Sequence, residues 1–249
     1  MEAFHADVEL YKANPEDAIK DFKQRVQRKI EQENELFIDP DFFRAIQSYF
    51  PQITEVEIHL ERGQHHNELT QFRYNVVLRI ETILDFSTDF PESNWTEQQL
   101  TLSEVRNQLG KSEGLRVIGV PNSRLFGPLK SAELLRNSQD FGTTEEFQAI
   151  KSEIIPENAV EPEDFSALAE DLSLSVWVTW SDTPDRYDVI FATLENSQRN
   201  YIAFTPTHTA KPEGETSLRC RRGVCGRHAA DTARHHFTDP SGGTDVASF

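Results

Sequence analysis

The sequence is short of several features, and each shortage excludes a class of protein. No apolar run approaches the roughly 20 residues that a helix needs to cross a bilayer. The N-terminus, MEAFHADVELYK, has no basic segment leading into an apolar core, as a secretory signal would. Among 249 residues only Cys220 and Cys225 are cysteines, too few for a disulfide framework. We therefore expect a cytoplasmic protein without structural disulfides.

Basic residues are also scarce, because 25 Lys and Arg face 42 Asp and Glu and leave a formal charge of -17. Such a surface has little to offer the phosphates of nucleic acid or an anionic membrane, which bind Lys and Arg. We expect neither as a partner. The charge is uneven: residues 1–205 carry -18 and residues 206–249 carry +1.

Residues 206–249 show no hydrophobic periodicity, and we expect them to be a disordered tail that is not native to the fold. A change of reading frame in the encoding DNA would account for the shift in composition. The tail holds a set of possible metal ligands with irregular spacing and no apolar residues around them. These are Cys220, Cys225, His228, His235 and His236. Zinc sites need closer pairing and a compact scaffold, so no metal site is expected.

Hydrophobic spacing predicts an α/β protein. Asn14-Pro15 opens an amphipathic helix over 15–33, and Asp39-Pro40 opens a second helix that Pro51 ends. Alternating apolar and polar residues then predict two strands, 53–61 and 72–81, which pair as an antiparallel hairpin. Tyr74 lies on the apolar side of this pattern.

The rest of the chain has shorter signals. Residues 86–100 are polar and are expected to be a connector, and Thr101 with Glu104 forms a capping box at the start of a helix. The further elements expected are a strand at 115–120, helices at 128–136, from 143 and from 161, strands at 174–180 and 187–191, and a short strand at 201–204.

The loop between the two hairpin strands, about residues 62–71, is longer than a tight turn and contains HHNELTQ. Loops of this length often carry function, whereas two-residue turns rarely do. We therefore place the candidate site here.

The stretch NELTQFRYNVV at 67–77 resembles the second core motif, NELSxYRYxAV, of the N-methyltransferase domains embedded in nonribosomal peptide synthetases. VWVTWSDTPDRYD at 176–188 is a weaker counterpart of the third motif, with Val176 and Asp188 matching outright. ENELFIDPDFF at 33–43 and GVPNSR at 119–124 are also similar to this family. The resemblance covers about residues 1–205.

The resemblance implies a division of the chain. Residues 1–86 would be the C-terminal portion of a Rossmann-like class I methyltransferase, and 87–205 a small α+β subdomain that follows it. The family's first motif, a Gly-rich turn that cradles the cofactor, has no counterpart in this sequence. We therefore expect no cofactor-binding residues here, and no tight binding of S-adenosylmethionine by this chain alone.

The resemblance also implies roles for the loop, because an incoming amine must lose a proton and a His or carboxylate could accept it. The catalytic candidates are His65, His66, Asn67 and Glu68, and the substrate-binding candidates are Arg73 and Tyr74. The alternatives are structural: a polar loop for Asn67 and Glu68, solvated rings for the two His, and strand packing for Arg73 and Tyr74.

The function that follows is a fragment of an S-adenosylmethionine-dependent N-methyltransferase acting on aminoacyl groups bound to a carrier protein. Its partners would be the remainder of the synthetase, including adenylation and carrier domains, or a separate cofactor-binding half. Two alternatives remain: a non-catalytic docking piece, and a degenerate fragment without function.

Overall fold

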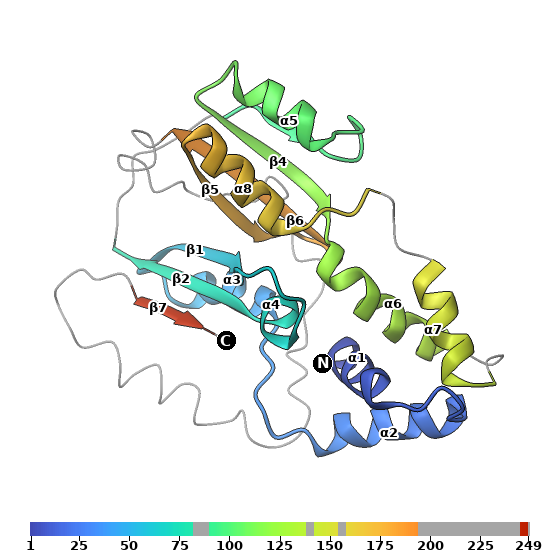
Figure 1. Cartoon of the computed structure of the whole chain (residues 1–249). Coiled ribbons are helices and arrows are strands. Elements are labelled where there is room, and N and C mark those ends of the chain that lie inside the picture. Colours follow the sequence, from blue (N-terminus) through green and yellow to red (C-terminus); the bar gives the residue numbers. More distant parts are fainter. Residues whose placement is uncertain (82–89, 138–141, 154–157, 194–244, 249) are drawn as a thin grey trace.

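The chain folds around one mixed β-sheet with helices packed on it and beside it (Figure 1). The computed structural model describes residues 1–81, 90–137, 142–153, 158–193 and 245–248. The sheet has seven strands in the order β3-β4-β6-β5-β1-β2-β7. Among the strands that the structure describes, only β3 and β4 pair in parallel, and they lie at the end of the sheet opposite to β7. The α/β class is confirmed.

The elements alternate irregularly along the chain. The helices are α1 (Glu2–Lys12), α2 (Ile19–Gln32), α3 (Pro40–Tyr49), α4 (Glu68–Phe72), α5 (Leu102–Leu109), α6 (Ser123–Asn137), α7 (Thr144–Glu153) and α8 (Pro162–Leu172). The strands are β1 (Ile53–Leu60), β2 (Tyr74–Ile80), β3 (Glu92–Asn94), β4 (Gly114–Pro121), β5 (Leu174–Trp180), β6 (Arg186–Thr193) and β7 (Asp245–Ser248).

The predicted hairpin is confirmed: β1 and β2 pair antiparallel, with Ile58 opposite Val76 and Leu60 opposite Tyr74. Its apolar face packs against α3 through Phe43. The outer edge of β2 pairs with β7, so the prediction of disorder is wrong for residues 245–248. An edge strand offers a row of unpaired backbone groups, and a short segment can pair with it wherever it lies in the sequence.

Strands from both predicted units, 1–86 and 87–205, lie in the same sheet, although few residues pair between them. The only register pair between β1 and β5 joins His59 to Thr179. Beyond it the hairpin diverges from the other strands, as Figure 1 shows. The division at residue 86 therefore stays a prediction.

The largest core lies between the sheet and the helices α5 and α8. Phe165 of α8 is fully buried there, and its ring contacts the rings of Trp95, Tyr187 and Phe191. Aromatic rings bury large apolar areas and favour such tilted and edge contacts. This core fixes the start of α8 relative to β6, which matters for the site below.

A second core lies among α1, α2, α6 and α7, beside the sheet. The helix predicted over 15–33 begins only at Ile19, because the carbonyl oxygens of Asn14 and Pro15 accept hydrogen bonds from Thr144 of α7. A tertiary contact thus overrides a local start signal. Helix α1 had no clear signal in the sequence.

Two predictions in the second half were incomplete. The polar connector 86–100 contains β3, a three-residue strand with no apolar alternation. Helix α6 begins at Ser123 and runs through Pro128, earlier than the expected start at 128. The strand expected at 201–204 and the possible ligands of the tail lie outside the described residues. Within the described part of the chain, no helix is both long and apolar enough to cross a membrane.

The aromatic core gives a direct test of the fold. We expect Phe165→Ala to lower the free energy of unfolding by about 3–5 kcal/mol, because it removes a buried ring and leaves a cavity. The control is Tyr11→Ala, since Tyr11 is 92% exposed and its loss should change stability by about 0.5 kcal/mol or less. Urea denaturation measures both. Equal effects of the two variants would contradict the assignment of the core.

Candidate functional site

The predicted functional loop is a compact structure that contains the short helix α4. Asn67 is the N-cap: its side-chain oxygen accepts from the backbone N–H groups of Leu69 and Thr70, at 2.9 and 3.2 Å. The hydroxyl oxygen of Thr70 accepts in turn from the backbone N–H of Asn67 at 3.3 Å, which completes a capping box. This pairing satisfies N–H groups that a helix start leaves open.

Asn67 and Glu68 were both predicted to be catalytic, and their side chains differ in contacts and exposure. The Asn67 side chain is engaged in capping, so the structural alternative describes what it does here. The Glu68 side chain is exposed in the first turn of α4, where a carboxylate interacts favourably with the helix dipole.

The two histidines differ as well. The described part of the chain provides no side-chain partner for His65, whose carbonyl oxygen accepts from Thr70 Oγ1 at 2.6 Å. His66 Nε2 lies 2.8 Å from Oε2 of Glu161, which sits just before α8. The structure thus links His66 to a residue far along the chain and leaves the ring of His65 exposed.

The two predicted substrate-binding residues point in different directions. Arg73 is exposed at the end of α4. Tyr74 is buried, contacts the rings of Phe43 and Trp180, and donates its hydroxyl to the carbonyl oxygen of Ile38 at 2.6 Å. Burial, followed by the nearby charge of Asp39, raises the pKa of Tyr74 to about 12. Tyr74 therefore has a packing role, as its place in the alternating pattern indicated.

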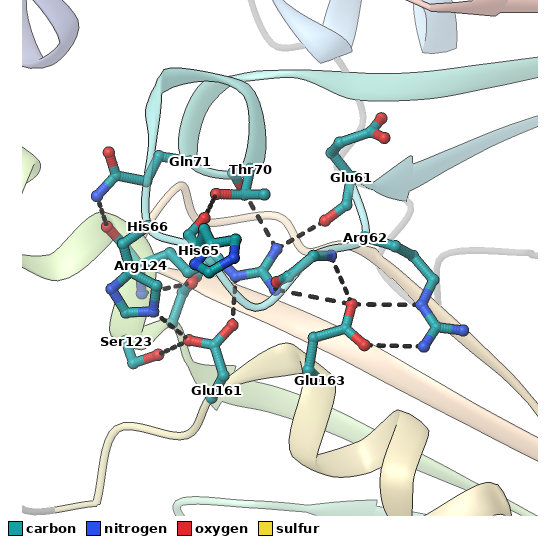
Figure 2. A network of polar contacts seen from close by, with 12 residues as sticks. Glu61, Arg62, His65, His66, Thr70, Gln71, Ser123, Arg124, Glu161 and Glu163 are labelled. Carbon is teal, nitrogen blue, oxygen red and sulfur yellow. Dashed lines mark hydrogen bonds and ion pairs between the residues drawn. The ribbon is translucent and has the colours of Figure 1, made fainter.

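The centre of the site is a residue that the sequence analysis did not single out (Figure 2). Arg124 is 1% exposed, and its guanidinium lies under the loop. It donates to the carbonyl oxygens of Glu61 and Gly63, each at 2.6 Å, and to that of Thr70 at 3.3 Å. It also donates through Nε to Glu161. One buried cation thus holds both ends of the loop.

Two carboxylates close the network on the side of α8. Glu161 accepts from Arg124, from Ser123 Oγ at 2.8 Å and from His66. Glu163 accepts from Arg62 at 2.8 Å and from the backbone N–H of Gly63 at 2.8 Å. Charge-assisted hydrogen bonds of this kind are stronger than neutral ones, and shared partners make them a network.

Gly63 is required in this loop for a steric reason. Its φ of +148° is a conformation that side-chain-bearing residues rarely adopt, and a Cβ there would lie 2.8 Å from Thr70 Cγ2. The close approach brings the Gly63 carbonyl oxygen to Arg124 and its N–H to Glu163.

The segment GVPNSR at 119–124 explains how Arg124 is positioned. The side-chain oxygen of Asn122, which is buried, accepts from the backbone N–H of Arg124 at 3.0 Å and so starts α6. Pro128 has no N–H to offer to the carbonyl oxygen of Arg124 four residues earlier. That oxygen accepts instead from Gln71 Nε2 at 3.2 Å, which ties α6 to the loop once more. GVPNSR resembles the family and contains Arg124, so this likeness was the sequence signal that could have pointed to Arg124 as a residue of the site.

The weaker motif counterpart at 176–188 forms β5, a turn and β6. Asp188 accepts from the backbone N–H of Gly119 at 2.9 Å, where β4 is irregular. Burial raises the pKa of the Asp188 carboxyl, and hydrogen bonds from Gly119 and Ser181 oppose the shift. The pKa of Glu163 shifts in the opposite direction, because the hydrogen bond from Arg62 holds the pKa of this carboxyl below its usual value.

One hollow in the described part of the chain lies away from the loop. A nucleotide-like cofactor usually binds at a Gly-rich turn between a strand and a helix, where the backbone can approach it closely. This hollow of about 330 Å³ lies between α5 and α8, and it is lined by none of the predicted site residues. The binding of S-adenosylmethionine therefore stays a prediction.

Comparison with known proteins supports one part of this interpretation. No model of a protein family matches the chain. Over 131 residues, half of this chain, it is 38% identical to chondramide synthase cmdD of Chondromyces crocatus. A probable non-canonical nonribosomal peptide synthetase, CymA of Salinispora arenicola (strain CNS-205), is 33% identical over 135 residues, 54% of the chain. Cyclosporin synthetase simA of Tolypocladium inflatum is 27% identical over 214 residues, 76% of the chain.

The matched region is a small part of each of these large proteins: 3% of chondramide synthase, 2% of CymA and 1% of cyclosporin synthetase. The chain is therefore related to a short segment of nonribosomal peptide synthetases.

The burial of the Arg124 guanidinium predicts that two arginine variants lower the stability by different amounts. Arg124→Met should lower the free energy of unfolding by about 3–5 kcal/mol, because it breaks a buried ion pair with Glu161 and removes the donor of three loop carbonyl oxygens. Arg62→Met is the matched control: Arg62 also bonds Glu163, but its side chain is 64% exposed, so its loss should cost about 1 kcal/mol or less. Denaturation gives the free energies. Amide hydrogen exchange over residues 61–72 should accelerate only in Arg124→Met, and unchanged exchange would contradict the role of Arg124.

The two shifted carboxyls predict opposite dependences on pH. The lowered pKa of Glu163 means that its charged form stabilises the fold above its ordinary pKa of 4.5, and this stabilisation is lost as pH falls through the lowered value. The raised pKa of Asp188 means that its charged form costs stability once pH rises from its ordinary value of 3.8 through the raised value. At neutral pH, Glu163→Gln should destabilise and Asp188→Asn should stabilise. Both differences should shrink in acid, as urea denaturation across pH would show.

Proposed function

We propose that this chain is the loop-bearing part of an N-methyltransferase domain from a nonribosomal peptide synthetase. The comparisons above support a relation to a segment of the synthetases. The observation that supports the methyltransferase role is the loop of residues 61–72. Its family-like sequence is folded, anchored from beneath by Arg124, and presents His65, His66 and Glu68 outward.

In this proposal the chain orients a substrate amine, and the cofactor is held elsewhere. An anchored loop keeps its outward side chains in one arrangement, and such preorganisation is what positioning an aminoacyl group requires. S-adenosylmethionine supplies the methyl group in the complete domain. The substrate would be an aminoacyl group on a carrier protein, so the partners are the carrier and adenylation domains or a separate cofactor-binding half.

The alternative is a non-catalytic docking piece. It is favoured by one observation, a set of exposed large apolar side chains on and around α3 that has no role in the loop. These are Leu36 at 77%, Tyr49 at 72%, Phe42 at 40% and Phe50 at 38% exposed. Apolar side chains gathered on a surface often mark a contact with another protein.

A methylation assay distinguishes the two functions, and calorimetric titration with S-adenosylmethionine tests where the cofactor binds. The chain alone should show no micromolar binding, because it lacks the cofactor cradle. A separately produced half with the Gly-rich motif should bind the cofactor and, with this chain added, methylate an aminoacyl carrier protein. The docking alternative predicts complex formation in which the chain adds nothing to methylation.

The control for that experiment is the Arg124→Met chain added to the same half. It should restore less methylation than the unaltered chain, because its loop is no longer anchored. Micromolar cofactor binding by the isolated chain would contradict the proposed division of the domain. Methylation that is unaffected by either chain would contradict the function itself.

A further inference from the structure

The contact between His66 and Glu161 determines which ring nitrogen of His66 carries the proton. His66 Nε2 lies 2.8 Å from Glu161 Oε2. An ionised carboxylate can only accept hydrogen bonds, so Nε2 must carry the proton of this bond. In the neutral ring the other nitrogen, Nδ1, is then bare and able to accept a proton.

Glu161 is itself held without help from His66. Ser123 donates to the same oxygen, Oε2, at 2.8 Å, and the buried Arg124 donates through Nε to Oε1. Both donors belong to the first residues of α6, and Glu161 immediately precedes α8. The carboxylate therefore has one orientation, set by two helices, when the loop brings His66 to it.

The ring is open on its other side. The His66 side chain is 50% exposed, whereas the guanidinium beneath it is 1% exposed (Figure 2). The neighbouring His65 is exposed too, yet the described residues offer its ring no carboxylate. Two adjacent histidines on one loop thus differ in having a carboxylate partner.

We propose that Glu161 is a positioning residue that holds His66 with Nδ1 bare, and that this Nδ1 accepts a proton from the ammonium group of a substrate. The inference rests on the proposed function, and it names the acceptor and its partner for that same loop. One N–H bond of the ammonium breaks and one forms on Nδ1. The products are a neutral amine and an imidazolium, whose charge Glu161 offsets.

The first experiment is nitrogen-15 NMR of the histidine side chains in the full chain, at a pH where the rings are neutral. His66 should appear as the single tautomer protonated at Nε2, and His65 as a mixture. In Glu161→Gln the preference of His66 should be lost, and Glu161→Asp should restore part of it. A mixture at His66 in the unaltered chain would overturn the proposal.

The control variant separates orientation from general loosening of the loop. Glu163→Gln removes another carboxylate that bonds the loop and lies 3.8 Å from Arg124, but it leaves Glu161 and His66 in place. It should keep the tautomer of His66. If it removes the preference as fully as Glu161→Gln does, the positioning role of Glu161 is wrong.

The second experiment tests proton acceptance with alaninamide, which carries an α-ammonium group, at constant pH and up to its solubility limit. The Nδ1 resonance of His66 should move toward the imidazolium position, while His65 should stay unchanged. N-acetylalaninamide, which lacks the ammonium group, should move neither. Equal responses of the two histidines, or no response of His66, would overturn the acceptor role.

The outcomes separate this inference from the function on which it rests. Methylation that this chain does not change, together with a confirmed tautomer, would reject the methyltransferase function and leave the contact between His66 and Glu161 as a feature of the chain. Successful methylation with a mixed tautomer at His66 would reject the proposed role of that contact alone.

Discussion

A buried guanidinium is the constraint on which this arrangement depends. Removing Arg124 from water costs several kcal/mol unless its donors are satisfied, and here they are met by Glu161 and by carbonyl oxygens of Glu61, Gly63 and Thr70. These partners come from the end of β1, the loop and the start of α8. Burial of one side chain therefore requires the hairpin and two helices to take their places together.

Several residues of the loop motif stabilise the fold. Asn67 and Thr70 cap the start of α4 with their side chains. Tyr74 packs its ring against α3 and donates its hydroxyl to the chain just before α3. Their neighbours His66 and Glu68 are left facing outward. A motif that mixes both kinds of residue keeps its outward side chains in a fixed arrangement, because the structural members leave the backbone little freedom.

Local signals predicted much of this structure, and distant contacts account for the rest. The hairpin and the capping box at Thr101 follow from periodicity and short-range hydrogen bonds, so the sequence was sufficient for them. Arg124 bonds residues 37 and 63 positions away, and no spacing rule reaches that far. For the same reason β7 could not be foreseen, since its strand is defined by a partner rather than by its own pattern.

The way Arg124 holds the loop has a consequence for its variability. The guanidinium bonds backbone carbonyl oxygens at Glu61, Gly63 and Thr70, and every amino acid possesses such an oxygen. Side chains at exposed positions such as Gln64 and Leu69 can therefore be exchanged while the anchor stays the same. A mutant library confined to these positions would therefore vary the outer surface of the loop on an unchanged backbone.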